Sequence, residues 1–193
     1  LNLSALPEMV PLAAELGVDL QQFIHPFFNS AANAEEQNRI LSRDWARSRG
    51  LTVHAPSLPP GEYYACDMTA RDVSTIRRGL DAARRQAAGK IRMKVLPNLS
   101  ESLLAPYYLD LAHPFPGLCN TVWQKARIMP DGSFSPCMHV VFGNIREQPL
   151  MEMWNGSAMG RFRRILSKRV FPACARCCNR GFNGSKGESA FQD

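Results

Sequence analysis

The sequence predicts an α/β protein whose second half follows a different pattern from its first. Residues 1–105 alternate amphipathic helices with short apolar strands, and glycines separate the helices from the strands that follow. From about residue 106, prolines, an expected β-hairpin and spaced cysteines replace that alternation. We therefore expect two domains, residues 1–105 and residues 106–193.

The first helix is expected over residues 4–16. Ser4 is suited to the N-cap, Pro7 lies in the first turn, and Gly17 ends the helix. Residues 18–24, whose apolar members are Val18, Leu20, Phe23 and Ile24, then predict a strand. A helix, a glycine and a short apolar strand are typical of a parallel α/β layer.

A second helix is expected over residues 34–48, with Asn33 as its cap and Gly50 after its end. Residues 51–55 form a candidate strand. A third helix is expected over residues 70–88, capped by Thr69, followed by a strand at 91–96. Its apolar stripe consists of Val73, Ile76, Leu80, Ala83 and Ala87.

Two or three such units cannot close a (β/α) barrel, which has eight strands. Residues 1–105 are therefore either a small open sheet or the last part of a larger barrel. Beyond them, Pro106, Pro114, Pro116 and Gly117 are expected to form a connector.

The second half is expected to be a small α+β domain. Residues 127–136 predict a β-hairpin around the Asp131-Gly132 turn. A helix is expected over residues 157–168. Its inward face consists of Met159, Phe162, Ile165 and Leu166.

Composition narrows the class of protein. The 193 residues are 45% hydrophobic with a net charge of +6, so a packed core is expected. Solvated helix faces account for the arginines, and nucleic acid is not the expected partner. No run of 18 apolar residues occurs, so no membrane span is expected.

Six cysteines are too few for a disulfide scaffold of this size, which favours metal binding in a reducing, cytoplasmic setting.

Four cysteines fall in a spaced pattern: Cys119, then Cys137 after the hairpin turn, then the pair Cys174 and Cys177. Four thiolates suit zinc or an iron–sulfur cluster. The first two cysteines are separated by 17 residues, which argues against a zinc ribbon built from two tight pairs.

The segment from Cys119 to Cys178 resembles the SPASM/Twitch auxiliary-cluster domain found at the C-terminus of radical SAM enzymes. The matching pieces are the cysteine spacing, I-x-P-D-G-x-x-x-P-C, G-N-I and L-x-x-x-W-N-G. This resemblance implies that Cys119, Cys137, Cys174 and Cys177 hold an auxiliary [4Fe-4S] cluster. No cysteine follows Cys178, which indicates the shorter, one-cluster Twitch form.

The resemblance also implies that residues 1–105 are the last helix–strand units of a partial (β/α) radical SAM barrel. The Cys-x-x-x-Cys-x-x-Cys triplet of the SAM-binding cluster does not occur in the sequence. We therefore expect this chain alone to be inactive and to lack the N-terminal half of the enzyme. That half would bring S-adenosylmethionine and a second [4Fe-4S] cluster.

In the complete enzyme, the auxiliary cluster would bind substrate or transfer electrons during radical-based modification of a small molecule or peptide. An electron donor such as flavodoxin or ferredoxin is implied. Two alternatives stay open: a stand-alone iron–sulfur module for electron transfer or partner binding, and a structural zinc domain.

Further residues are either candidate contacts or are expected to play no part at the cysteine site. His25 and Asn29 follow the end of the first expected strand, where a barrel places substrate or SAM contacts. Cys178 and Cys66 are interpreted as bystander thiols, and His139 as a packed or exposed side chain rather than a ligand. Trp123 and Trp154 are expected in the core around the cluster.

Overall fold

The computed structural model describes residues 3–40, 43–48, 50, 67–115, 117–137 and 140–180, without the side chains of residues 43 and 45. Its elements in chain order are η1 (Leu3–Ala5), α1 (Met9–Glu15), β1 (Leu20–Ile24), α2 (Ala31–Ile40), α3 (Arg43–Ser48), α4 (Ala70–Ala87), β2 (Arg92–Leu96), α5 (Glu101–Leu109), α6 (Thr121–Gln124), β3 (Arg127–Ile128), β4 (Ser133–Ser135), β5 (Gly143–Asn144), α7 (Leu150–Asn155), α8 (Ser157–Leu166) and η2 (Pro172–Arg176).

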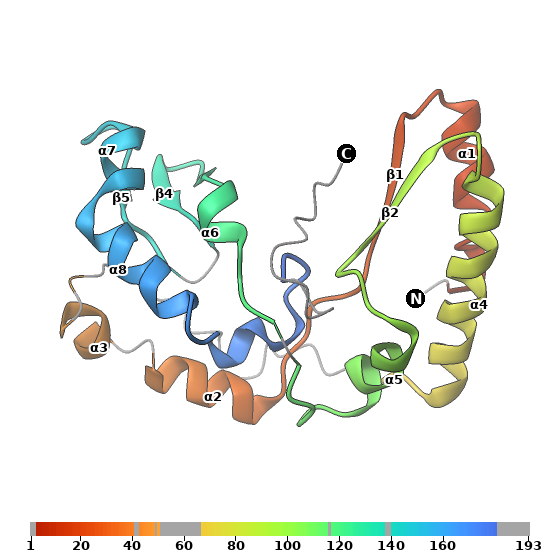
Figure 1. The fold of residues 1–193 in the computed structure, drawn as a ribbon, viewed down its shortest axis with the longest axis horizontal. Coiled ribbons are helices and arrows are strands. Elements are labelled where there is room, and N and C mark those ends of the chain that lie inside the picture. The colour runs from red at the N-terminus through yellow and green to blue at the C-terminus, as the bar shows by residue number, and fades with distance from the viewer. Residues whose placement is uncertain are drawn as a thin grey trace.

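The first lobe is a two-stranded parallel sheet covered by helices (Figure 1). Strands β1 and β2 pair from Leu20 opposite Arg92 to Ile24 opposite Leu96. The side chains of Phe23, Met93 and Val95 pack toward the buried clusters that involve α1 and α4. The expected mixed α/β fold is thus confirmed. The partial barrel stays a prediction. In the described part of the chain, the parallel sheet consists of β1 and β2, and two strands do not distinguish part of a barrel from a small open sheet.

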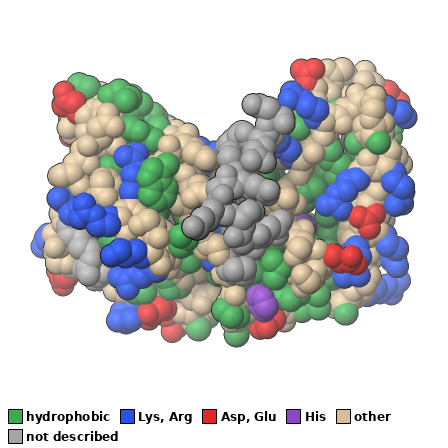
Figure 2. All heavy atoms as spheres, in the orientation of Figure 1, with side chains coloured by type: hydrophobic (Ala, Val, Ile, Leu, Met, Phe, Trp, Pro, Cys, Tyr) green, Lys and Arg blue, Asp and Glu red, His purple; other side chains and the backbone are tan. Residues whose placement is uncertain are grey.

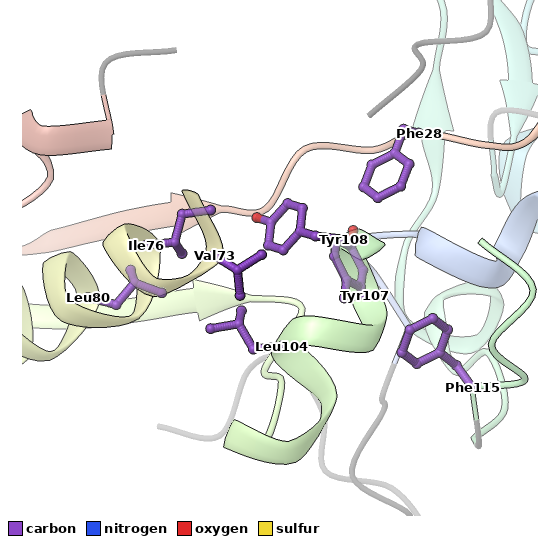
Figure 3. Close-up of a cluster of buried hydrophobic side chains, with 8 residues drawn as sticks. All are labelled: Phe28, Val73, Ile76, Leu80, Leu104, Tyr107, Tyr108 and Phe115. Atoms are coloured by element: carbon purple, nitrogen blue, oxygen red, sulfur yellow. The ribbon is translucent and has the colours of Figure 1, made fainter. Parts of the chain in front are cut away.

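Helix α4 follows the sequence prediction closely. The Thr69 hydroxyl accepts a hydrogen bond from the Asp72 backbone N–H, and the Asp72 carboxylate accepts one from the Thr69 N–H. This reciprocal capping box satisfies N–H groups that the first turn leaves free. The whole expected stripe of the helix is buried. Val73, Ile76 and Leu80 join the core shown in Figure 3.

The first two expected helices begin and end at other residues than predicted. Residues 4–16 form η1 and then α1, which starts at Met9 rather than Ser4. The expected helix 34–48 is described as α2 and α3, and α2 begins at Ala31. Ser30 rather than Asn33 caps it, because the Ser30 hydroxyl accepts the Asn33 N–H at 3.1 Å. The candidate strand at 51–55 lies outside the described residues.

The prediction that Pro106 begins a connector is wrong, because Pro106 lies inside helix α5. A proline in a helix removes one backbone hydrogen bond. Here the helix buries Leu104, Tyr107 and Tyr108. Packing of this apolar surface outweighs the missing bond, as most helical stability in proteins comes from tertiary contacts.

The second lobe is a three-stranded antiparallel sheet, β3-β4-β5, flanked by α6, α7 and α8 (Figure 1). The predicted hairpin is confirmed: β3 pairs with β4 across the turn at Gly132, whose φ of 87° suits glycine. The core of this lobe comprises Ala46, Val122, Val140, Met159, Phe162, Leu166 and Phe171. Ala46 belongs to α3, so residues that precede position 105 contribute to this second core.

Charged side chains of both signs are spread over the face shown in Figure 2, with Lys and Arg on both lobes. The ion pairs of α4 are exposed ones, such as Arg84 with Asp81 at 2.9 Å, and pairs of this kind contribute little stability. Among the described helices, none has the length and apolar character needed to cross a membrane.

Candidate metal centre

The four predicted cysteine ligands come from three segments of the second lobe. Cys119 precedes α6, and Cys137 lies two residues after the end of β4, where it forms an isolated antiparallel bridge with Val140. Cys174 lies within η2, and Cys177 ends that short helix. All four are half-buried, and none is in a disulfide within the described residues. Three of them, Cys119, Cys137 and Cys174, pack against the same apolar core, so residues far apart in the chain converge there.

The electrostatics of these thiols indicate a shared, enclosed environment. Burial raises the pKa of Cys174 to about 12, and the neighbouring Cys137 and Cys119 add to the rise. A hydrogen bond between the adjacent thiols raises the pKa of Cys177 and lowers that of Cys178 to about 6. Metal ligation requires deprotonated thiols, so binding a metal group here would release protons.

The donor set consists of soft thiols, which suit zinc or an iron–sulfur cluster. Zinc needs four donors about 2.3 Å from one point. In the portion of the chain described, no group of three or more His, Cys, Asp or Glu side chains meets around one ion. In a four-iron cluster each iron takes its own cysteine, so the four sulfurs lie farther apart. The soft thiol donors and apolar surroundings also suit such a cluster.

A buried arginine attaches the Cys174–Cys177 turn to the first lobe. Arg176 lies between the two cysteines and is fully buried. Its guanidinium donates hydrogen bonds to the carbonyl oxygens of Tyr107 at 2.8 Å and Asp110 at 2.6 Å. In return the Tyr107 hydroxyl donates to the Arg176 carbonyl oxygen at 3.0 Å.

Aromatic rings surround the same guanidinium. Its Cζ lies 4.9 Å from the Phe28 ring centre and 5.4 Å from that of Phe115. Figure 3 shows Phe28, Tyr107 and Phe115 around the end of α5. These contacts hold the cysteine turn against the core of the first lobe.

Two more buried side chains contact the cysteine turn. The Gln37 side-chain oxygen, on α2, accepts the Ala173 backbone N–H at 3.1 Å. Arg180 is 6% exposed, and its guanidinium donates to the carbonyl oxygens of Phe115, Gly117 and Cys174. Sequence reasoning missed Gln37, Arg176 and Arg180. The sequence could have indicated a role for Arg176, because this residue lies between two predicted ligands. No sequence pattern near Gln37 indicates that it contacts the cysteine turn.

His25 and Asn29 lie where the sequence places them, beyond the carboxyl end of β1. The His25 N–H continues the ladder to the Leu96 carbonyl oxygen at 2.7 Å. Its ring is buried, with Nδ1 2.6 Å from the Tyr108 hydroxyl. Asn29 is also buried, and neither of its amide atoms has a hydrogen-bond partner among the described residues. Their role as substrate or SAM contacts stays a prediction.

The remaining candidates have mixed outcomes. Trp154 packs against the second core, with the Arg163 guanidinium 4.4 Å from its ring centre. The core prediction for Trp123 is wrong, because this side chain is 43% exposed at the end of the short helix α6. His139 and Cys66 lie outside the described residues.

Comparison with known proteins agrees with the position of this centre. Residues 119–178 match the family model of the SPASM iron–sulfur cluster-binding domain. The match begins at Cys119 and ends at Cys178, so the segment has the SPASM sequence pattern and its predicted resemblance is confirmed. The match covers less than half of the chain.

A crystal structure of BtrN in complex with AdoMet and 2-DOIA is similar to this chain at 16% sequence identity. The comparison covers 97% of this chain and 84% of that one, with a TM-score of 0.33. A likeness this weak supports no conclusion about function. No curated protein matches the chain.

Proposed function

We propose that this chain is the C-terminal portion of a radical SAM enzyme and that Cys119, Cys137, Cys174 and Cys177 hold an auxiliary [4Fe-4S] cluster. The observation that carries the proposal is the SPASM match over residues 119–178, which starts at the first of these cysteines. The convergence of Cys119, Cys137 and Cys174 on one apolar core supports it.

The cluster, when bound, supplies a site for substrate coordination or one-electron transfer during radical-based modification of a small molecule or peptide. The residues of the chain prepare this site. The apolar core around Val140 and Phe171 packs against Cys119, Cys137 and Cys174 and partly shields these half-buried thiols from water. Arg176 holds the Cys174–Cys177 turn in position from the side of the first lobe.

Cleavage of S-adenosylmethionine requires a second cluster and its Cys-x-x-x-Cys-x-x-Cys triplet, which the sequence does not contain. We propose that a further, N-terminal part of the enzyme provides it. His25 and Asn29, at the carboxyl end of β1, are the proposed contacts to SAM or substrate. Flavodoxin or ferredoxin is the proposed electron donor.

Iron content tests the ligand assignment. In the anaerobically reconstituted chain, Cys174→Ala and Cys177→Ala should lose the cluster and its broad visible absorption, because a cluster iron then lacks its thiolate. Cys178→Ala and Cys66→Ala are matched controls that should keep full iron. Full iron in both Cys174→Ala and Cys177→Ala would refute the assignment.

The metal itself separates the proposal from the structural zinc alternative. A colourless wild-type chain with one zinc per molecule would overturn the iron–sulfur proposal. Elemental analysis of the same samples gives both metals at once.

A further inference from the structure

Positive charge gathers in one stretch of the second lobe. Residues 153–180 contain 7 of the 23 lysines and arginines of the chain and none of its 17 acidic residues. The net charge of the whole chain is +6, so the rest of the sequence is close to neutral. Such an asymmetry in charge is a property of association with a partner rather than of the fold.

The exposed part of this charge lies at the end of helix α8. Arg164 and Lys168 are four residues apart and therefore share one side of the helix, and Arg169 follows them. All three are exposed, and none of them pairs with a carboxylate among the described residues. The helix dipole favours cations at this end, but it amounts to about half a charge, which three cations exceed. We call these three residues the α8 basic surface.

Helix α4 is also rich in arginine but differs in its balance of charge. Arg77 pairs with Glu101 at 3.3 Å, and Arg84 pairs with Asp81 at 2.9 Å. These are the mixed charges of an ordinary solvated helix face. Helix α8 contains no acidic residue that could play the same part.

The opposite face of α8 lies against the predicted cluster site. Its buried side chains belong to the core against which three of the predicted ligands pack: Met159, Phe162 and Leu166. Phe162 stacks on Phe171 with 5.9 Å between ring centres, and Phe171 directly precedes the helix η2 that contains Cys174 (Figure 1). A helix with its side chains is about 10 Å across. A protein seated on the α8 basic surface would therefore come within about one helix diameter of the cysteine core.

The same surface lacks apolar anchors. Of the large apolar side chains that are exposed in the described residues, none lies between positions 152 and 180. Stable interfaces need such anchors, and a membrane-bound helix inserts an apolar face, which α8 buries in its own core. Electron-transfer encounters are small and transient, and opposite charges guide them. The surface therefore fits an acidic redox protein.

We infer that the α8 basic surface is the docking site for a small acidic electron-carrier protein that reduces the auxiliary cluster. The inference rests on the proposed function, since it needs a cluster on the cysteines. In the transfer no bond forms or breaks. The reduced carrier loses one electron, and the cluster bound by the chain gains it.

The test uses a reduced, acidic flavodoxin as the probe. One variant of the full chain combines Arg164→Glu with Lys168→Glu. The control combines Arg78→Glu with Arg85→Glu, which makes the same change in net charge on exposed residues of α4, away from η2 in Figure 1. Stopped-flow measurements at low and high salt give the association rate with the metal-free and the loaded chain. They also give the rate at which flavodoxin or dithionite reduces the loaded chain, and iron content is measured on every sample.

At low salt the α8 variant should associate with flavodoxin about tenfold more slowly than wild type, or more slowly still. High salt should reduce this difference, because it screens exposed charges. The α4 variant should remain near wild type, and dithionite should reduce all loaded samples alike.

A wild-type rate in the α8 variant would overturn the inference. Equal slowing in both variants would do so too, because net charge alone would then govern association. Tighter binding of tRNA than of flavodoxin through Arg164 and Lys168 would also overturn it, since the surface would then be a nucleic-acid site. A wild-type chain that loads no cluster would overturn the proposed function instead, because docking is measured on the metal-free chain as well.

Discussion

At the scale of single residues, buried polar side chains determine how the cysteine turn is held. Arg176 binds carbonyl oxygens of the first lobe, and Gln37 binds the backbone at Ala173. Hydrogen bonds that involve a charged group are stronger than neutral ones. Removing such a group would leave buried carbonyl oxygens without a donor, which is costly. The turn therefore depends on residues outside the matched cysteine segment.

His25 has a titration behaviour that its surroundings explain. Burial, and to a smaller extent the positive charge of Arg84, lowers the pKa of His25 to about 4 from its usual 6.5. Between these two values the unfolded chain binds a proton that the folded chain does not bind. The stability that comes from keeping His25 neutral is therefore fully present above pH 6.5, and it is lost as the pH falls toward 4.

We predict that His25 contributes about 3 kcal/mol to the loss of stability between about pH 7 and about pH 4. In His25→Gln this part of the loss should disappear, although the variant is less stable at neutral pH because the Tyr108 contact is altered. Urea unfolding of the metal-free chain across this range measures it. His113→Gln, at a more exposed histidine, is the control. An equal pH dependence in wild type and His25→Gln would contradict the prediction.

At the scale of elements, local sequence patterns predict regular helices well and irregular ones poorly. Helix α4 has its cap, its length and its buried stripe as the sequence indicates, because these features depend on residues three or four positions apart. Helix α5 was missed because its proline argues against a helix, and the packing of Tyr107 and Tyr108 that outweighs it is not local.

The capping box at the start of α4 should contribute measurably to stability. Thr69→Ala removes the hydroxyl that accepts the Asp72 N–H, and we predict a loss of about 1 kcal/mol in the free energy of unfolding. Thr75→Ala is the matched control. Its hydroxyl donates to the Arg71 carbonyl oxygen inside the helix, so alanine there should be neutral or slightly stabilising. Equal losses in the two variants, by urea unfolding, would exclude a capping contribution.

At the scale of the whole molecule, the two lobes share contacts through the cysteine turn. Helix α5 of the first lobe accepts the Arg176 hydrogen bonds, and helix α2 contacts η2 through Gln37. A group that binds the cysteines only in the folded state stabilises the folded segments that pack against them. Binding of the cluster should therefore also stabilise segments of the first lobe, although these segments supply no ligand.

We predict that cluster loading slows amide hydrogen exchange in residues 101–110 as well as in residues 119–178. Helix α1 is the internal control: it packs on α4 and lies away from the turn in Figure 1, so its exchange should stay unchanged. Exchange mass spectrometry of the metal-free and loaded chains compares these segments. Slower exchange confined to residues 119–178 would show that the lobes are not coupled in this way.

The sequence by itself determined the features that depend on near neighbours. These are the cysteine spacing, the hairpin turn at Gly132, the parallel-sheet pattern of residues 18–24 and 91–96, and the SPASM resemblance. Each follows from residue types at short, regular separations, where backbone geometry limits the alternatives.

Only the tertiary structure decided which side chains are buried around the cysteines. Gln37 and Ala173, or Tyr107 and Arg176, meet across long stretches of chain, and no local pattern encodes such meetings. The same holds for Arg180, which the sequence does not distinguish from a surface arginine, although it is 6% exposed and its guanidinium donates to the Cys174 carbonyl oxygen. Long-range packing sets burial, and burial determines how strongly a charge acts on its neighbours.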